Sequence, residues 1–250
     1  MKANYHTHTY RCNHASGKER EYIENAICAG MDTLGFSDHV PYPHMKGAYS
    51  GYRMKPELAG DYVRTLRALQ EEYQGKIRIL IGYEAEYYPD LFPDMLDFLE
   101  QYGYDYLLLG QHFVGDSAET CYSGNPTDDE SVLRQYVDQT LEGLRTGKYK
   151  YFAHPDVFQF TGDENLYRKH MGRLCREARE MDIPLEVNML GIEGARHYPS
   201  DRFFEIAAET GNKVIIGCDA HRPGVMGDKD LEEKTLQFIE KFPLTLITEF

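Results

Sequence analysis

Short apolar segments alternate with longer amphipathic segments along the whole chain. Seven segments carry the apolar, β-branched or aromatic runs expected of buried parallel strands: Ala3–His8, Thr33–His39, Arg78–Tyr87, Tyr106–Phe113, Tyr151–Asp156, Pro184–Met189 and Lys213–Asp219. Seven others have helical periodicity: Gly17–Ala29, Lys55–Gln74, Leu91–Tyr102, Asp128–Thr146, Glu164–Met181, Pro199–Thr210 and Leu231–Lys241. Because a helix-length segment follows each strand, the pattern predicts an α/β protein made of repeated strand–helix units.

Such units build either an open doubly wound sheet or a closed barrel, and periodicity alone does not distinguish the two. Polar residues occur at the C-terminal end of every predicted strand: His6, His8, His39, Glu84, His112, His154, Asn188, Asp219 and His221. A closed parallel barrel gathers these ends around one site, so we favour the barrel. No linker or internal repeat divides the chain, and we expect a single domain over residues 1–250.

Composition narrows the function classes. The chain has 250 residues, 42% of them hydrophobic, and a formal net charge of −14, which disfavours long nucleic acid as a partner. It contains no apolar run of the roughly 18 residues that a membrane helix needs, and its start lacks the apolar core of a signal peptide, so a cytoplasmic protein is expected. The five cysteines include no C-x-x-C pair. Reduced thiols are therefore expected rather than a disulfide framework or a zinc ribbon.

Two pairs of polar residues have the spacing of metal ligands on a strand. His6 and His8 are two positions apart, so both imidazoles point to one face of an extended segment. An isolated H-x-H pair is more often an ordinary pair of surface or core histidines. However, Asp219 and His221 repeat the spacing after a buried strand and offer a carboxylate and an imidazole. The two pairs together favour a divalent-metal site.

Further candidate ligands follow other strands. Glu84 ends the third predicted strand, where a carboxylate can bridge two cations, and Glu86 is the nearby competitor for that role. His112 and His154 each follow an apolar run. Either histidine alone could be a core residue bonded to a backbone carbonyl, but their recurrence at the same strand end favours a shared site. Two more imidazoles follow the same pattern: His14 lies in the loop after the first predicted strand, and His39 ends the second.

These segments resemble the ligand motifs of the polymerase and histidinol phosphatase (PHP) family of phosphoesterases. The motifs are H-T-H-T at 6–9, His14, S-D-H at 37–39, G-Y-E at 82–84, G-Q-H at 110–112, H-P-D at 154–156 and C-D-A-H at 218–221. The resemblance spans nearly the whole chain. It implies a distorted seven-stranded (β/α) TIM-like barrel that holds three divalent ions, whether zinc, manganese or iron, at the C-terminal strand ends.

The resemblance also implies a ligand assignment. The first ion takes His6, His8, Glu84 and Asp219, the second takes the bridging Glu84 with His112 and His154, and the third takes His14, His39 and His221. Imidazoles and carboxylates around several ions suit hydrolysis, because a bridging water becomes hydroxide near neutral pH and attacks phosphorus. A metal-dependent phosphomonoesterase is therefore expected, with Glu84 and Asp219 acting in catalysis through the metals.

Residues outside the ligand set are candidates for substrate contacts. An arginine fork pairs two phosphate oxygens, so Arg11, Arg196 and Arg222 are candidate substrate-binding residues, although each has an ordinary alternative as a solvated loop arginine. His197 or His44 could protonate the leaving group, as could a metal-bound water.

Within the family, segments such as Leu185–Asn188 and Tyr198–Ser200 look most like the histidinol-phosphatase branch, which acts on L-histidinol phosphate in histidine biosynthesis. The chain departs from that branch after His154-Pro155-Asp156, where a basic residue is common, and around Arg196. A small phosphorylated metabolite is thus the expected partner. The alternatives are a PHP enzyme for another small phosphate ester or nucleotide, a metal-binding protein without turnover, and an amidohydrolase-like enzyme that cleaves C–N bonds.

Overall fold

The computed structural model describes residues 1–45 and 49–250. Its main element is an eight-stranded sheet, parallel throughout, with the strand order β1-β2-β3-β4-β7-β8-β9-β10. The strands are β1 (Ala3–Asn4), β2 (Thr33–His39), β3 (Arg78–Ala85), β4 (Tyr106–Leu109), β7 (Tyr149–Phe152), β8 (Leu185–Asn188), β9 (Lys213–Gly217) and β10 (Thr245–Ile247). A separate antiparallel hairpin joins β5 (Phe113–Val114) to β6 (Cys121–Tyr122).

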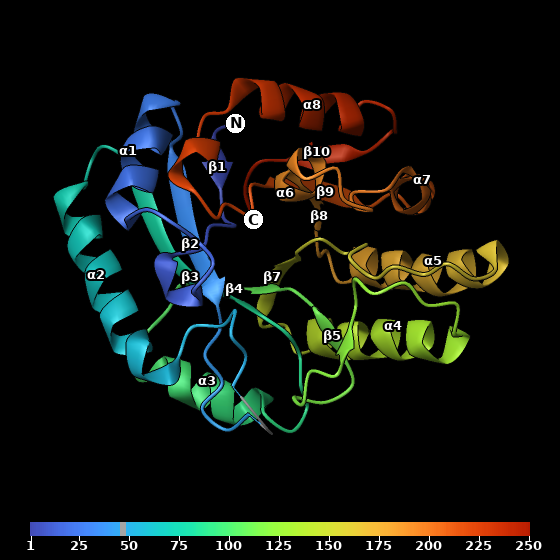
Figure 1. Cartoon of the computed structure of the whole chain (residues 1–250). Coiled ribbons are helices and arrows are strands. Elements are labelled where there is room, and N and C mark those ends of the chain that lie inside the picture. The colour runs from blue at the N-terminus through green and yellow to red at the C-terminus, as the bar shows by residue number, and fades with distance from the viewer. Residues whose placement is uncertain (46–48) are drawn as a thin grey trace.

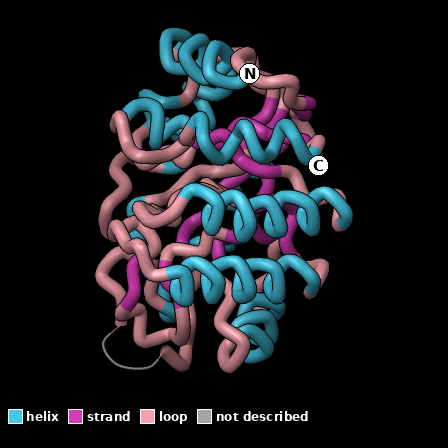
Figure 2. The backbone as a smooth tube through the Cα atoms, turned by 90° about the vertical axis from the view of Figure 1, so that its right-hand side faces the viewer, coloured by secondary structure: helices cyan, strands magenta, loops and turns pink. Residues whose placement is uncertain are grey.

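Helices surround the curled sheet (Figure 1). They are α1 (Glu19–Cys28), α2 (Ala59–Glu72), α3 (Phe92–Glu100), α4 (Glu130–Arg145), α5 (Glu164–Glu180), α6 (Met189–Glu193), α7 (Asp201–Thr210) and α8 (Lys229–Ile239), with short 3-10 turns at Tyr10–Cys12, Pro56–Leu58 and Pro223–Val225. Figure 2 shows several of them stacked side by side over the strands. Polar caps begin five of them, since Asp129, Asp163, Asn188, Ser200 and Asp228 accept hydrogen bonds from first-turn amides.

The predicted α/β class and the distorted-barrel architecture are confirmed. Each predicted strand overlaps an observed one, but the number differs, because β10 adds an eighth strand beside β9. Its three residues are partly exposed and form no buried apolar run, so the hydrophobic pattern did not predict a strand there. The predicted strand Tyr106–Phe113 is divided between β4 and the hairpin strand β5, and α6 was not predicted.

Backbone hydrogen bonds join the segment after β1 to the segment after β9 beside the candidate site. The His8 amide donates to the Ala220 carbonyl at 2.9 Å, and the Ala220 amide donates to the His6 carbonyl at 3.2 Å. These bonds place the segment after β1 against the segment after β9, an interaction seen also as a bridge between Thr7 and Ala220. The predicted metal-ligand pairs at both ends of the sequence therefore lie next to each other.

The sheet separates two apolar clusters. The larger one lies between the strands and the surrounding helices, and it contains such residues as Tyr22, Phe36 and Leu109. A smaller cluster lies on the concave side of the sheet and comprises Ala3, Tyr5, Tyr106, Leu108, Tyr151, Ala153 and Ile215. The ring of Phe250 packs 4.3 Å from that of Tyr5 and 5.9 Å from that of Tyr151, centroid to centroid. Among the described residues, no helix is long and apolar enough to cross a bilayer.

Candidate metal centre

Glu84, at the end of β3, is the centre of a group of imidazoles. Its side chain is 1% exposed, and its Oε1 lies 2.7 Å from His154 Nε2 and 3.3 Å from His112 Nε2. The other oxygen, Oε2, lies 3.1 Å from His39 Nδ1. The Nε2 atoms of the H-x-H pair are 3.4 and 3.5 Å from the same Oε2. A carboxylate with imidazoles at both oxygens has the arrangement needed to bridge two cations.

Asp219, after β9, lies opposite Glu84 across the H-x-H pair. Its Oδ1 is 3.1 Å from His8 Nε2 and 3.6 Å from His6 Nε2. Asp219 and His154 both have a left-handed backbone, with φ of 48° and 31°. Side chains other than glycine adopt this conformation at a cost of about 1–3 kcal/mol, and such residues concentrate at functional sites.

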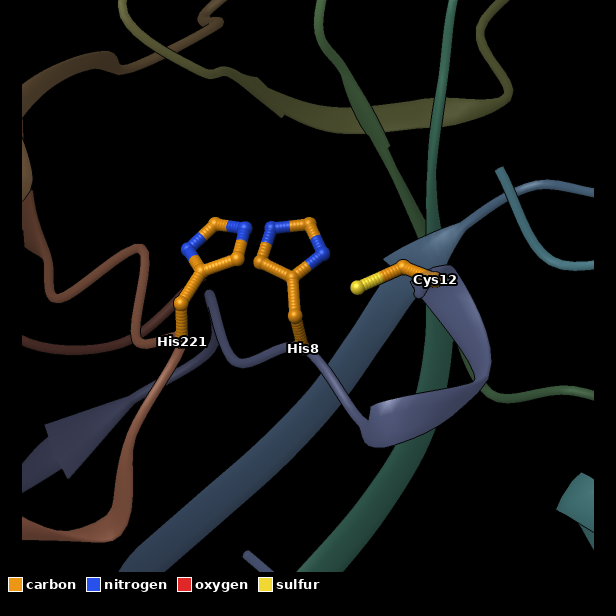
Figure 3. Close-up of side chains that lie close together, drawn as sticks. All are labelled: His8, Cys12 and His221. Carbon is orange, nitrogen blue, oxygen red and sulfur yellow. The ribbon is translucent and has the colours of Figure 1, made fainter. Parts of the chain in front are cut away.

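A third group consists of histidines alone. His14, His39 and His221 can bring ligand atoms within 4.8 Å of one another, and His14 Nε2 lies 2.8 Å from His221 Nε2. The His221 ring stacks on His8 at 4.1 Å, and Figure 3 shows His8 between His221 and the sulfur of Cys12. Burial raises the pKa of the Cys12 thiol far above its usual value. The thiol is therefore neutral and a poor metal ligand.

The electrostatics divide the histidines into two sets. Burial disfavours charge on His6, yet the nearby carboxylates, Glu186 foremost, raise its pKa well above the ordinary value. Likewise, hydrogen bonds to Asp219 and Asp38 outweigh burial and raise the pKa of His8 to about 9.

In the second set, burial dominates. It lowers the pKa of His14, lowers that of His39 well below the ordinary value and, with the positive charge of His8, brings that of His221 to about 3. His14, His39 and His221 are thus neutral and ready to bind a cation.

The buried ligand atoms fit divalent ions. His6 Nε2, His8 Nε2, His39 Nδ1 and Glu84 Oε2 are buried and have no hydrogen-bond partner among the described residues. Burying such atoms unpaired is costly, and a shared cation removes that cost. Several sets of three place their ligand atoms within 4.8 Å: His6, His8 and Asp219; His6, Glu84 and His154; His8, His39 and Glu84; and His14, His39 and His221. Imidazole with carboxylate is a donor set suited to zinc, manganese or iron.

A model of the PHP domain matches residues 4–190 of the chain. The chain belongs to the PHP family.

Curated relatives of this PHP protein match most of its length. A probable histidinol-phosphatase of Deinococcus radiodurans is 29% identical over 231 residues, which cover 89% of this chain and 87% of the relative. The histidinol-phosphatase of Bacillus subtilis is 25% identical, with 91% of this chain and 96% of the relative covered.

Solved structures support the PHP fold. The histidinol phosphate phosphatase of Lactococcus lactis, crystallised with zinc, L-histidinol and phosphate, superposes with a TM-score of 0.74 at 20% identity, covering 100% of this chain and 96% of the other. The putative histidinol phosphatase of Listeria monocytogenes gives a TM-score of 0.73, also at 20% identity, covering 91% of this chain and 98% of the other. At this level of identity, the superpositions establish the fold.

The predicted ligands of the PHP site converge. All nine lie in one region, and eight of them take part in the three-residue sets above; His14 and His221 join through the all-histidine set. His112 is in none of these sets, but its Nε2 faces the carboxylate of Glu84 at 3.3 Å.

A pocket of about 430 Å³ opens over the PHP site. Its lining comprises His14, His39, Tyr52, Glu84, His112, Phe113, Tyr122, His154, Val157, Leu190, Arg196, Tyr198, Asp219 and His221. Arg196 is the arginine among these residues, and its Nη1 donates to the hydroxyl of Tyr198 at 2.7 Å. Aromatic rings and one guanidinium thus surround the opening above the candidate ligands.

The other predicted substrate residues lie elsewhere. Contrary to the prediction, Arg11 does not line the pocket, because its buried guanidinium turns toward the helices, where it pairs with Glu19 and, at 2.7 Å, with Asp61. Arg222 pairs with Glu193 and is also absent from the lining.

Neither candidate proton donor faces the pocket. His197 is not a lining residue, and its Nε2 lies 2.8 Å from the Val157 carbonyl. His44 is exposed and is likewise absent from the lining.

The sequence did not reveal that two buried carboxylates, Glu86 and Glu186, lie behind the ligands and hold them in place. Glu86 lies 2.7 Å from His112 Nδ1 and pairs at 2.8 Å with the buried guanidinium of Arg53, so it supports a ligand rather than competing with Glu84. Glu186 lies 2.8 Å from His6 Nδ1. One signal was available in the sequence: an acidic residue inside an otherwise apolar strand needs a buried partner.

Proposed function

We propose that this chain is a metal-dependent phosphomonoesterase whose substrate is L-histidinol phosphate. The observation that carries the proposal is Glu84, a buried carboxylate with imidazoles at both oxygens, placed on the floor of an open pocket. The curated relatives named histidinol-phosphatase support the choice of substrate. The product alcohol would be L-histidinol, released with inorganic phosphate.

The proposed ligand assignment uses the three groups described above. His6, His8, Glu84 and Asp219 would hold the first ion, Glu84 with His112 and His154 would hold the second, and His14, His39 and His221 would hold the third. When bound, divalent ions lower the pKa of water and neutralise charge on a phosphoryl group. The chain contributes the fixed positions of the ligands.

Arg196 is the proposed phosphate-binding residue of the chain itself. Its guanidinium lines the pocket and is oriented by the hydroxyl of Tyr198. A planar guanidinium binds two phosphoryl oxygens at once. The rings of Tyr52 and Phe113, which also line the pocket, stack 6.1 Å apart and offer flat surfaces to an imidazole-bearing leaving group.

One observation favours a second candidate, a phosphate ester without an amino group. Within the described lining, the acidic residues are Glu84 and Asp219, both assigned to metals. The ammonium group of histidinol phosphate would therefore meet no separate carboxylate in the pocket. A small neutral or aromatic phosphate ester fits the same walls.

The deciding experiment compares three substrates: L-histidinol phosphate, p-nitrophenyl phosphate and a nucleoside monophosphate. Each is assayed with protein loaded separately with zinc, manganese or iron. We expect kcat/KM to be at least about 100-fold higher for histidinol phosphate, which corresponds to roughly 2.7 kcal/mol of discrimination. Turnover of the generic ester alone would support the second candidate. A metal-loaded protein inactive on every ester would refute the phosphatase proposal.

A matched pair of variants distinguishes the loss of a candidate metal ligand from the loss of a histidine elsewhere in the protein. His39→Gln removes a buried group 3.1 Å from Glu84, whereas His44→Gln changes an exposed histidine outside the pocket lining. We expect the first variant to lose at least 100-fold in kcat and the second to match the wild type.

A further inference from the structure

Glu186, on β8, lies behind the metal centre and is 0% exposed. Its Oε1 is 2.8 Å from His6 Nδ1 and accepts a hydrogen bond from the Tyr151 hydroxyl at 3.3 Å. Its Oε2 accepts from the backbone amide of His154 at 2.9 Å and from the side-chain amide of Asn188 at 2.8 Å. Four donors therefore surround one buried carboxylate.

A glycine on the neighbouring strand makes room for the carboxylate of Glu186. A Cβ at Gly217, on the neighbouring strand, would lie 1.8 Å from Oε1. The absence of a side chain at this position lets the carboxylate lie against the β9 backbone. Asn188 extends the contact, because its Nδ2 also lies 3.1 Å from Asp219 Oδ2.

We propose that Glu186 is a positioning residue that aligns the ligands of two of the three metal ions. This inference rests on the proposed metal-dependent function. By accepting the Nδ1 proton of His6, Glu186 leaves the Nε2 lone pair of that ring directed at Asp219 and Glu84. By accepting the amide of His154, it fixes the backbone of a ligand whose φ is 31°. Through Asn188 it also orients Asp219.

The third group of ligands lies outside this network. His14 Nδ1 is 2.9 Å from the Cys12 carbonyl, and His221 Nδ1 is 2.9 Å from the Asp219 carbonyl. Backbone carbonyls thus orient these two rings without help from Glu186. Loss of the Glu186 carboxylate should consequently weaken the binding of two ions and leave the binding of the third unchanged.

An isosteric change makes the role testable. In Glu186→Gln, an NH₂ group placed toward His6 would donate to Nδ1 and force the proton onto Nε2, which is the atom that should bind metal. In the opposite orientation, the NH₂ group would face the His154 amide, so two donors would meet and that amide would lose its acceptor. Either orientation disturbs a ligand without changing the volume of the side chain.

The test measures zinc binding to full-length protein by competition with a chromophoric chelator. For Glu186→Gln we expect two of three zinc ions to bind about 10–100-fold more weakly and the third to bind as in the wild type. The matched control, Tyr151→Phe, removes the longest of the four hydrogen bonds and keeps the carboxylate. Its zinc affinities should equal those of the wild type.

Three results would overturn the inference. They are unchanged zinc affinities in Glu186→Gln, an equal loss of affinity for all three ions in that variant, or a loss of affinity for the same two ions in Tyr151→Phe. A wild-type protein that binds no zinc would instead remove the proposed function on which the inference rests. If Glu186→Gln does not fold, a measurement on the wild-type protein tests the inference instead. A histidine ¹⁵N spectrum of the zinc-loaded protein should show an exchange-protected proton on His6 Nδ1, assigned by its loss in His6→Gln, and its absence would count against the proposal.

Discussion

Gly110 sets the position of Glu84, and replacing it with alanine tests whether that position governs catalysis. Gly110 follows β4, and a Cβ there would lie 2.0 Å from Glu84 Oε1 and 2.6 Å from its Cδ. Cβ contacts essentially never fall below 3.0 Å, so the carboxylate has to move by about 1 Å. Imidazoles surround both of its oxygens, and this movement would change its distance to every one of them.

Gly110→Ala should lower both activity and stability. A misplacement of about 1 Å in a catalytic site costs about 100-fold in rate, or roughly 2.7 kcal/mol of transition-state stabilisation. Overpacking by one methyl group should lower the free energy of unfolding by about 1–3 kcal/mol. We would measure kcat and KM with zinc-loaded protein, the zinc content, and urea unfolding.

Gly51→Ala is the matched control, because a Cβ there meets nothing within 4 Å. The loss in Gly110→Ala should appear in kcat, since the glycine has no side chain to contact the substrate. A Gly110→Ala protein with normal zinc content and a kcat within about threefold of the wild type would refute the reasoning, because the carboxylate would then tolerate the displacement.

Four further outcomes are expected. Arg196→Ala should raise KM for a phosphate ester about 10–100-fold, and an unchanged KM in steady-state kinetics would contradict its role. Arg11→Ala should lower the free energy of unfolding by about 3 kcal/mol in urea titrations, because it leaves a buried carboxylate unpaired, while KM stays constant. Burial raises the pKa of Asp156 to about 6. Between about pH 4 and pH 6, Asp156 is therefore protonated in the folded state and ionised in the unfolded chain. The free energy of unfolding should consequently fall by about 3 kcal/mol as pH rises through that window. Unfolding of Asp156→Asn in a chelating buffer should show a flatter pH dependence there, and an unchanged profile would exclude this group as the cause. Phe250→Ala should lower the free energy of unfolding by about 1–2 kcal/mol without changing zinc affinity, because its ring packs on tyrosines of the concave cluster but is 41% exposed; an unchanged melting temperature would contradict this.

Much of the fold was predictable from the sequence because most strands are buried on both faces. The apolar run at Leu107–Leu109 marks its strand through composition alone. In contrast, β10 is three residues long and partly exposed, so no periodicity identifies it. The backbone bonds between Ala220 and the H-x-H segment link residues more than 200 positions apart, and local patterns carry no information about such pairing.

The site could be predicted where spacing reflects geometry. His6 and His8 share a face because they are two apart on extended chain, whatever the rest of the fold does. The direction of a long side chain depends on tertiary partners instead. Arg11 follows the H-x-H motif closely but turns away toward Glu19, and nothing in the local sequence distinguishes it from Arg196.

The junction between the two ends of the chain has a consequence for folding. The first proposed ligand is His6 and the last is His221, and the Ala220 backbone bonds to the segment that carries the first. During synthesis, therefore, the ligand set stays incomplete until residue 221 has left the ribosome. Contacts this distant in sequence form late and slowly, because loop-closure entropy opposes them. We therefore expect the protein to bind metal only after the segment that carries His6 has paired with the segment around Ala220. Metal binding should then report the last step of folding.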